Sequence, residues 1–123
     1  MPIRWTVDQS REMLLAEAEG AITLQEVVEY LDAVVTAGTG PYRKLFDGSK
    51  AQSAMTDEEI MVLGARLRTY HGQGKTGALA IVVAADKTHG LARLFGVLAA
   101  ADRRTKIFNT LKAARDWIDE QPR

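Results

Sequence analysis

The chain of 123 residues contains no cysteine, which excludes disulfides and thiolate metal sites and favours a cytoplasmic location. Sixteen Lys and Arg residues balance sixteen Asp and Glu residues, so the net charge gives no argument for nucleic acid or an anionic membrane surface as a partner. No apolar run approaches the roughly 18 residues of a membrane span. The N-terminal residues also lack the continuous apolar stretch of a signal peptide. With 46% hydrophobic and 26% charged residues, the composition is typical of one globular domain, which we expect to span residues 1–123.

Five segments have the pattern of β-strands. Ile3, Trp5 and Val7 alternate with polar residues, and a second run follows after a short turn, which together predict an antiparallel hairpin at a sheet edge. Residues 78–85 are apolar throughout, as in a central strand that is buried on both faces. The polar stretch 48–55 predicts a loop. The five predicted strands cover residues 3–8, 13–18, 44–46, 78–85 and 106–108.

Four segments have helical spacing of apolar residues, and two of them begin with a capping box, formed by Thr23 with Glu26 and by Thr56 with Glu59. The predicted helices cover residues 24–35, 58–70, 91–101 and 111–118. The element order is therefore ββαβαβαβα. This order predicts an α/β fold with a five-stranded mixed sheet, made of an edge hairpin and then parallel strands, flanked by four helices.

The element order and several sequence segments resemble STAS domains, and most closely the SpoIIAA-like branch, whose fold is similar to that of CRAL-TRIO lipid-transfer domains. The segments are Gly20 after the second strand, Tyr-Arg-Lys-Leu-Phe-Asp at residues 42–47, Gly-Leu-Ala-Arg-Leu-Phe at residues 90–95, and the final pattern from Ile107 to Ile118. The resemblance covers nearly the whole chain. It implies a bacterial-type regulatory module that works through protein–protein interaction and is not an enzyme.

In the wider family of anti-sigma-factor antagonists, a kinase phosphorylates a Ser in an Asp-Ser-Ser-Gly segment at the start of the second helix. The corresponding stretch of this chain runs from residue 48 to residue 56 and does not contain that motif. Ser49, Ser53 and Thr56 lie in the stretch and are the phosphorylation candidates, but the departure from the motif argues against carrying the switch over.

Polar loops follow the third and fourth predicted strands, where ligands collect in sheets of this kind. The first loop begins Asp47-Gly48-Ser49, and the second is Asp86-Lys87-Thr88-His89-Gly90. The second loop precedes a helix, whose N-terminus and Lys87 favour an anion. The alternative is that Thr88 or Asp86 only caps the helix. The candidate ligand-binding or interaction surface consists of Asp47, Ser49, Asp86, Lys87, Thr88 and His89.

Catalytic and cofactor signals are weak. Asp47 with His89 could form an acid–base pair, and Asp86 could add a third metal ligand, but no motif with metal-ligand spacing supports a metal site. Residues 72–77 resemble a phosphate-binding loop, yet Thr69 stands where the first glycine is required and the segment follows a helix. We therefore expect neither a metal nor a cofactor.

Three functions follow in order of support. The first is the STAS-type interaction module. The second is a carrier or sensor of a small apolar or amphipathic ligand, held beside the second and third helices, where Gly64 and Gly96 interrupt helical segments. The third is an enzyme that uses Asp47 and His89. The sequence leaves open an unidentified protein partner, a small molecule or anion, and a homodimer.

Overall fold

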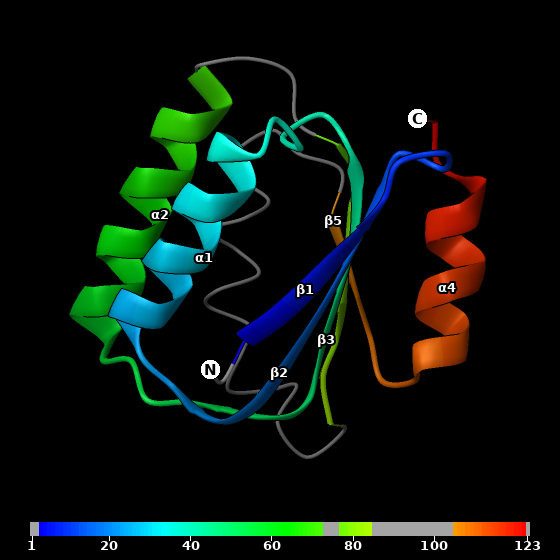
Figure 1. Cartoon of the computed structure of the whole chain (residues 1–123). Helices are drawn as coiled ribbons and strands as arrows, with labels where there is room; N and C mark the ends of the chain where they lie inside the picture. Colours follow the sequence, from blue (N-terminus) through cyan, green and yellow to red (C-terminus); the bar gives the residue numbers. More distant parts are fainter. Residues whose placement is uncertain (1–2, 73–76, 85–104, 123) are drawn as a thin grey trace.

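A five-stranded sheet runs through the centre of the molecule (Figure 1). The computed structural model describes residues 3–72, 77–84 and 105–122, and the account below concerns these residues. The spatial order of the strands is the order of the sequence. β1 is antiparallel to β2, and the remaining neighbours are parallel, which confirms the predicted edge hairpin and mixed sheet. The strands are β1 (Ile3–Asp8), β2 (Met13–Ile22), β3 (Arg43–Ser53), β4 (Leu79–Val82) and β5 (Thr105–Phe108).

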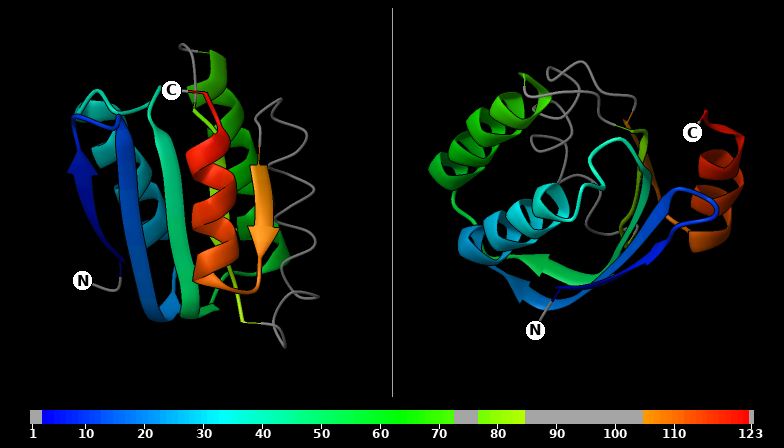
Figure 2. Two further views of the ribbon diagram at one scale, coloured as in Figure 1. Left: turned by 90° about the vertical axis from the view of Figure 1, so that its right-hand side faces the viewer. Right: turned by 45° about the horizontal axis from the view of Figure 1, so that its top comes forward.

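Helices cover both faces of the sheet. The helices α1 (Leu24–Thr36) and α2 (Asp57–Gly72) lie on one face, and α4 (Leu111–Glu120) lies on the other (Figures 1 and 2). These three confirm predicted helices to within about two residues at each end, whereas the predicted helix at residues 91–101 lies outside the described residues. No helix within the described ranges is long and apolar enough to cross a membrane.

The helices begin where their caps predict. The Thr23 hydroxyl accepts from the Glu26 N–H (3.2 Å), and Glu26 Oε1 accepts from the Thr23 N–H (2.9 Å). Thr56 and Glu59 repeat both bonds at the same distances at the start of α2. Each reciprocal pair satisfies two N–H groups at the start of a helix, so both capping boxes are confirmed.

Three strands differ in length from the prediction. β2 continues to Ile22, four residues beyond its predicted end at Ala18. The predicted loop at residues 48–55 is wrong, because β3 continues to Ser53 and its residues 50–53 pair with residues 19–22 of β2. The sequence did not predict this extension because the segment is mostly polar, and within it only Ala51 packs against a hydrophobic cluster. The segment is a strand because its backbone pairs with β2. β4 is shorter than predicted but lies between β3 and β5, in the interior of the sheet.

The core has a layer on each side of the sheet. On the α4 side, buried side chains from β2, β3, β4 and α4 form one cluster, and Phe108 and Trp117 pack against it with ring centroids 5.7 Å apart. On the other side, α1 contributes Val34 to a cluster with β2 residues, and α2 contributes Leu63 to a cluster with Leu79. The members of the α4-side cluster are Met13, Leu45, Ala78, Ala80, Val82, Ala114 and Ile118.

Two buried cations hold the beginning of β3. Lys44 Nζ donates to the carbonyl oxygens of Gly40 (2.7 Å) and Tyr42 (2.8 Å). Beside them, Gly77 leaves no room for a side chain, because a Cβ there would overlap the Tyr42 carbonyl oxygen. The chain segments that lead into β3 and β4 are therefore packed backbone against backbone.

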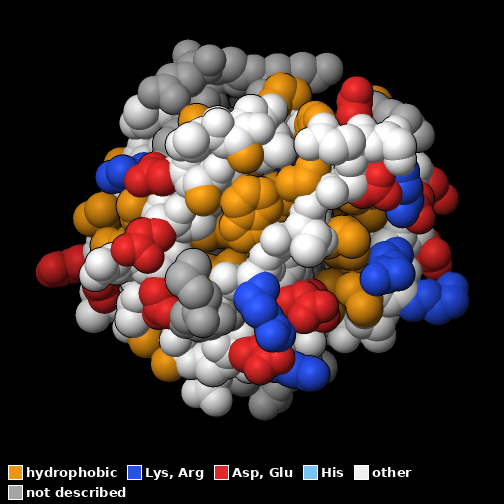
Figure 3. Space-filling view, viewed as in Figure 1, with side chains coloured by type: hydrophobic (Ala, Val, Ile, Leu, Met, Phe, Trp, Pro, Cys, Tyr) orange, Lys and Arg blue, Asp and Glu red, His pale blue; other side chains and the backbone are white. Residues whose placement is uncertain are grey.

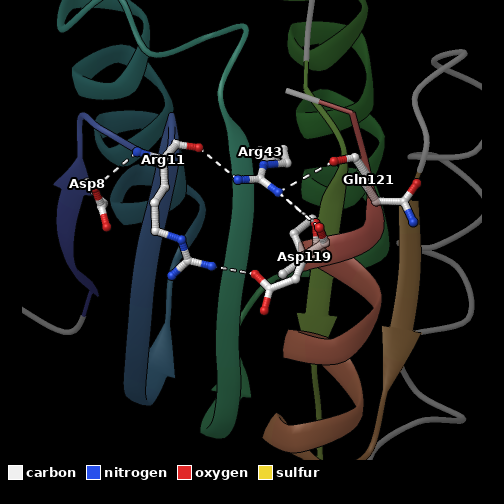
Figure 4. A network of polar contacts seen from close by, with 6 residues as sticks. Asp8, Arg11, Arg43, Asp119 and Gln121 are labelled. Atoms are coloured by element: carbon white, nitrogen blue, oxygen red, sulfur yellow. Dashed lines mark hydrogen bonds and ion pairs between the residues drawn. The ribbon is translucent and has the colours of Figure 1, made fainter.

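Arg43 connects three parts of the chain that are distant in sequence (Figure 4). Its Nη2 donates to the Arg11 carbonyl oxygen in the β1–β2 turn (2.7 Å), and its Nη1 lies near three carbonyl oxygens at the end of α4. Carbonyls at a helix C-terminus favour a positive charge. Arg11 and Asp119 add an exposed ion pair over the same junction (2.6 Å).

Candidate functional site

The predicted strand-end site contains a β-bulge. Asp47 pairs with Glu17 of β2 and with Val82, the last residue of β4. The β2–β3 register then shifts before Glu19, which leaves Gly48 and Ser49 together opposite a single residue of β2. Ser49 donates to Asp47 Oδ1 through both its N–H (3.1 Å) and its hydroxyl (2.7 Å). Asp47 and Ser49 are thus brought together, but inside a strand and not in a loop.

Gly48 explains why the bulge fits at this point. A Cβ at Gly48 would lie 3.2 Å from the Val82 carbonyl oxygen, which is tighter than most real contacts. The bulged part of β3 therefore approaches the carboxyl end of β4 closely, as glycine in a strand often allows. The result is a half-buried carboxylate and hydroxyl beside the point where β4 ends.

The phosphorylation candidates have different surroundings. The Ser49 hydroxyl is half-buried and already donates to Asp47. Thr56 is exposed, but its hydroxyl serves as the α2 cap, and Asp57, Glu58 and Glu59 follow in the first turn. These carboxylates would repel a phosphate on Thr56. Ser53 is the last residue of β3.

Four residues of the predicted surface, Asp86, Lys87, Thr88 and His89, lie outside the described residues. The proposed pairing of Asp47 with His89 and the proposed anion loop therefore stay predictions. Across residues 3–72, 77–84 and 105–122, no three His, Asp or Glu side chains gather in a way that could hold a metal ion.

A groove that the sequence did not reveal lies between α4 and the β1–β3 part of the sheet. Its volume is about 330 Å³. Arg4 at its wall forms ion pairs with Glu17 (3.7 Å) and Glu19 (3.3 Å), whereas the side chain of Arg115 makes no hydrogen bond or ion pair with any described residue. The lining residues are Arg4, Trp5, Thr6, Leu15, Ala16, Glu17, Leu45, Asp47, Leu111 and Arg115.

The residues of this groove come from four elements. Side chains alternate along a strand, so Leu45 and Asp47 lie on the same face of the sheet. This alternation is the one feature of the sequence that points to the groove. The prediction ended β3 at residue 46 and so treated Asp47 as part of a loop. The α4 residues of the groove are positioned by the packing of the helix against the sheet, and no local sequence pattern predicts that packing.

The first half of α2 exposes large hydrophobic side chains. Met61 is 67% exposed and Val62 is 54% exposed, although Leu63 in the same turn is buried. They follow directly on the acidic first turn of the helix. Exposed apolar side chains mark a contact surface when they form a contiguous patch, so these two neighbours are candidates for one.

One comparison with known proteins identifies a similar fold. No protein-family model matches the chain, and no curated protein matches it in sequence. Among solved structures, the chain is similar to the anti-sigma factor antagonist SpoIIAA in its unphosphorylated form, with a TM-score of 0.59 and 10% sequence identity. The similarity covers 96% of this chain and 98% of that one, which confirms the fold expected from the sequence resemblance.

Proposed function

We propose that this chain is a non-enzymatic regulatory module of STAS type that acts in the cytoplasm by binding a protein partner. The observation that carries the proposal is the end-to-end match with SpoIIAA, since 98% of that chain is covered and little is left over on either side. SpoIIAA is an anti-sigma factor antagonist. The fold alone does not name the partner, so the surface of the chain has to indicate where a partner binds.

The proposed contact surface has two parts. The first is the exposed pair Met61 and Val62 near the start of α2. The second is the Asp47–Ser49 bulge beside the end of β4, where Asp47 lines the groove on the other side of the sheet. We include residues 86–89 because they follow β4 closely in the sequence. Two apolar side chains beside an acidic helix turn would fit a partner surface with an apolar centre and basic residues at its rim.

Binding in this proposal does not depend on phosphorylation. Thr56 is already used as a helix cap, and the Ser49 hydroxyl already donates to Asp47. A phosphate on Thr56 in cells, or a Thr56→Ala variant that loses its partner without unfolding, would restore the phosphorylation switch that the family resemblance implies.

The experiment is partner capture with immobilised chain, comparing wild type with Met61→Glu and Val62→Glu. The matched control is Lys112→Glu, which reverses the charge of an exposed side chain on α4. We expect one or more proteins that bind wild type and the control but not the α2 variants, with unchanged melting temperatures for all four. Capture that is equal for every variant, or no specific capture, would contradict the proposed surface.

The groove supports a second candidate function, the binding of a small amphipathic ligand. Its volume lies at the lower end of the roughly 300–1,000 Å³ range of small-molecule sites. Leu15 and Leu45 supply apolar surface, and the Arg115 guanidinium could pair with an acid group. This position against α4 differs from the one predicted from the sequence, beside the second and third helices.

Melting with sodium octanoate or octanol tests this second function. A ligand that binds only the native state raises the melting temperature. Octanoate should raise the melting temperature of wild type more than octanol does, and the difference should disappear in Arg115→Ala. If neither compound changes the melting temperature, the groove is not a site for ligands of this class.

A further inference from the structure

We propose that two copies of this chain pair edge to edge through β1, so that the sheet continues across a twofold axis. β1 stands at the end of the strand order, and β2 is its one strand neighbour within the described residues. An end strand presents a row of N–H and C=O groups to any other strand. The proposal does not depend on the partner surface described above.

β1 has few of the features that protect sheet edges. Between Ile3 and Asp8 there is no proline, glycine or lysine, and the β1–β2 register is unbroken over all six residues. Proteins commonly block an edge with lysine, proline or a bulge. Among the described residues, the outer side of β1 is therefore regular and has no strand paired to it, so it can accept an antiparallel strand.

The side chains of β1 are complementary to themselves in one register. In a symmetric antiparallel pair, directly opposed residues point to the same face of the sheet. With Thr6 on the axis, Arg4 lies opposite the partner's Asp8, and Trp5 lies opposite the partner's Val7. Because of the twofold axis, each of these two pairs occurs twice in the dimer. With Trp5 on the axis, Arg4 would instead meet the partner's Thr6, and the charge match would be lost.

The surface around β1 has the composition of an interface. Trp5, Val7 and Tyr30 are half-buried and pack against the cluster beneath α1. Figure 3, viewed as Figure 1, shows hydrophobic side chains in the middle of the face formed by α1 and β1, with charged side chains around them. An apolar centre with a charged rim is typical of interfaces. The formal net charge of zero also means that two copies do not repel each other as net charges.

The expected dimer is concentration-dependent. Pairing over residues 4–8 alone would bury less than the roughly 800 Å² per partner of a standard stable interface. The half-buried side chains on the α1 side must therefore add contact area. Sedimentation velocity across a concentration series should show a monomer that converts to a dimer.

The absence of cysteine makes a covalent test possible. Thr6→Cys would place the two new thiols opposite each other on the axis, at a separation that suits a disulfide. Mild oxidation should then give a covalent dimer. Arg4→Cys, which has no thiol opposite it, and Lys112→Cys on α4 should remain mostly monomeric. Equal cross-linking in all three variants would overturn the proposal.

A charge swap tests the register without a cross-link. Arg4→Glu and Asp8→Lys each place like charges opposite each other, and each should weaken the wild-type dimer by a factor on the order of ten. The double variant Arg4→Glu with Asp8→Lys should recover most of the affinity, which a purely structural effect on each monomer would not produce. A wild-type chain that stays monomeric up to millimolar concentration, or a double variant weaker than both single variants, would overturn the proposal.

Discussion

Replacing Arg43 with Met should destabilise the fold far more than removing the ion pair of Arg11 with Asp119 that lies over it. The guanidinium of Arg43 is buried, with 4% of the residue exposed, and its acceptors are backbone carbonyl oxygens (Figure 4). The Arg11 and Asp119 side chains are 48% and 49% exposed. Arg43 and Arg11 lie at the same junction, so they allow a direct comparison between the buried hydrogen bonds of Arg43 and the exposed ion pair of Arg11.

The magnitude follows from the distances. The bond from Nη2 to the Arg11 carbonyl (2.7 Å) is a charge-assisted hydrogen bond, worth about 1.5–3 kcal/mol. Nη1 is shared among the carbonyls of Ile118, Asp119 and Gln121 at 3.3, 3.4 and 3.4 Å, which we count as one further bond of similar strength. Met does not carry the dehydration cost of a buried cation, which offsets part of this loss. We expect a net destabilisation of about 3 kcal/mol for Arg43→Met, against about 0.5 kcal/mol for Arg11→Ala.

Urea unfolding at two salt concentrations is the assay. The m-value should stay constant, so that the shift in midpoint reports stability. Arg11→Ala keeps the carbonyl that accepts from Arg43, and its small effect should shrink further in high salt. Arg43→Lys keeps the charge but not the planar fork and should fall between wild type and Arg43→Met. If Arg43→Met costs less than Arg11→Ala, the reasoning about the buried carbonyl contacts is refuted.

Three further predictions concern single positions. Thr56→Ala removes the α2 cap and should cost about 1 kcal/mol in urea unfolding, and Thr56→Ser should restore most of it. Gly77→Ala should cost about 3 kcal/mol or more because its methyl group overlaps a backbone carbonyl, whereas Gly38→Ala, with φ of +74° and open space around it, should cost about 1 kcal/mol. The Ser10 hydroxyl and the Arg11 N–H donate to Asp8 and hold its pKa below the ordinary value, so Ser10→Ala should raise that pKa in an NMR titration. Because the folded pKa is lowered, this contact stabilises the fold above the unfolded pKa, and its contribution is lost as pH falls through the folded pKa.

The sequence predicted those parts of the fold that depend on local chemistry. Alternation in residues 3–8 and the capping boxes at Thr23 and Thr56 each act within a few residues, and the structure confirms them. The second half of β3 was missed because Gly48, Lys50 and Ala51 have low strand propensity. That segment is a strand because β2 offers a backbone ladder beside it, which is a tertiary effect.

The candidate site was predicted only in part, for the same reason. The sequence identified Asp47 and Ser49 as neighbours near the end of a strand, but the hydrogen bonds between them depend on the register shift against β2. The exposure of Met61 and Val62 follows from the rotation of α2 about its axis, which the buried stripe fixes only approximately. The groove beside Arg115 requires the placement of four elements, and no spacing in the sequence encodes it.

The two ends of the parallel strands have different tasks in this fold. At the amino ends, the cations Arg43 and Lys44 are buried and held by main-chain carbonyls, and Gly77 packs against backbone. Substitutions there change stability, because each leaves buried carbonyls unpaired or introduces overlap. Beside the carboxyl end of β4, Asp47 and Ser49 are half-exposed and bond to each other within a bulge of β3, so a change there disturbs a local arrangement and leaves the core clusters intact. Residues beside the carboxyl end of β4 can therefore vary without loss of the fold, which is the division of roles that open α/β sheets commonly show.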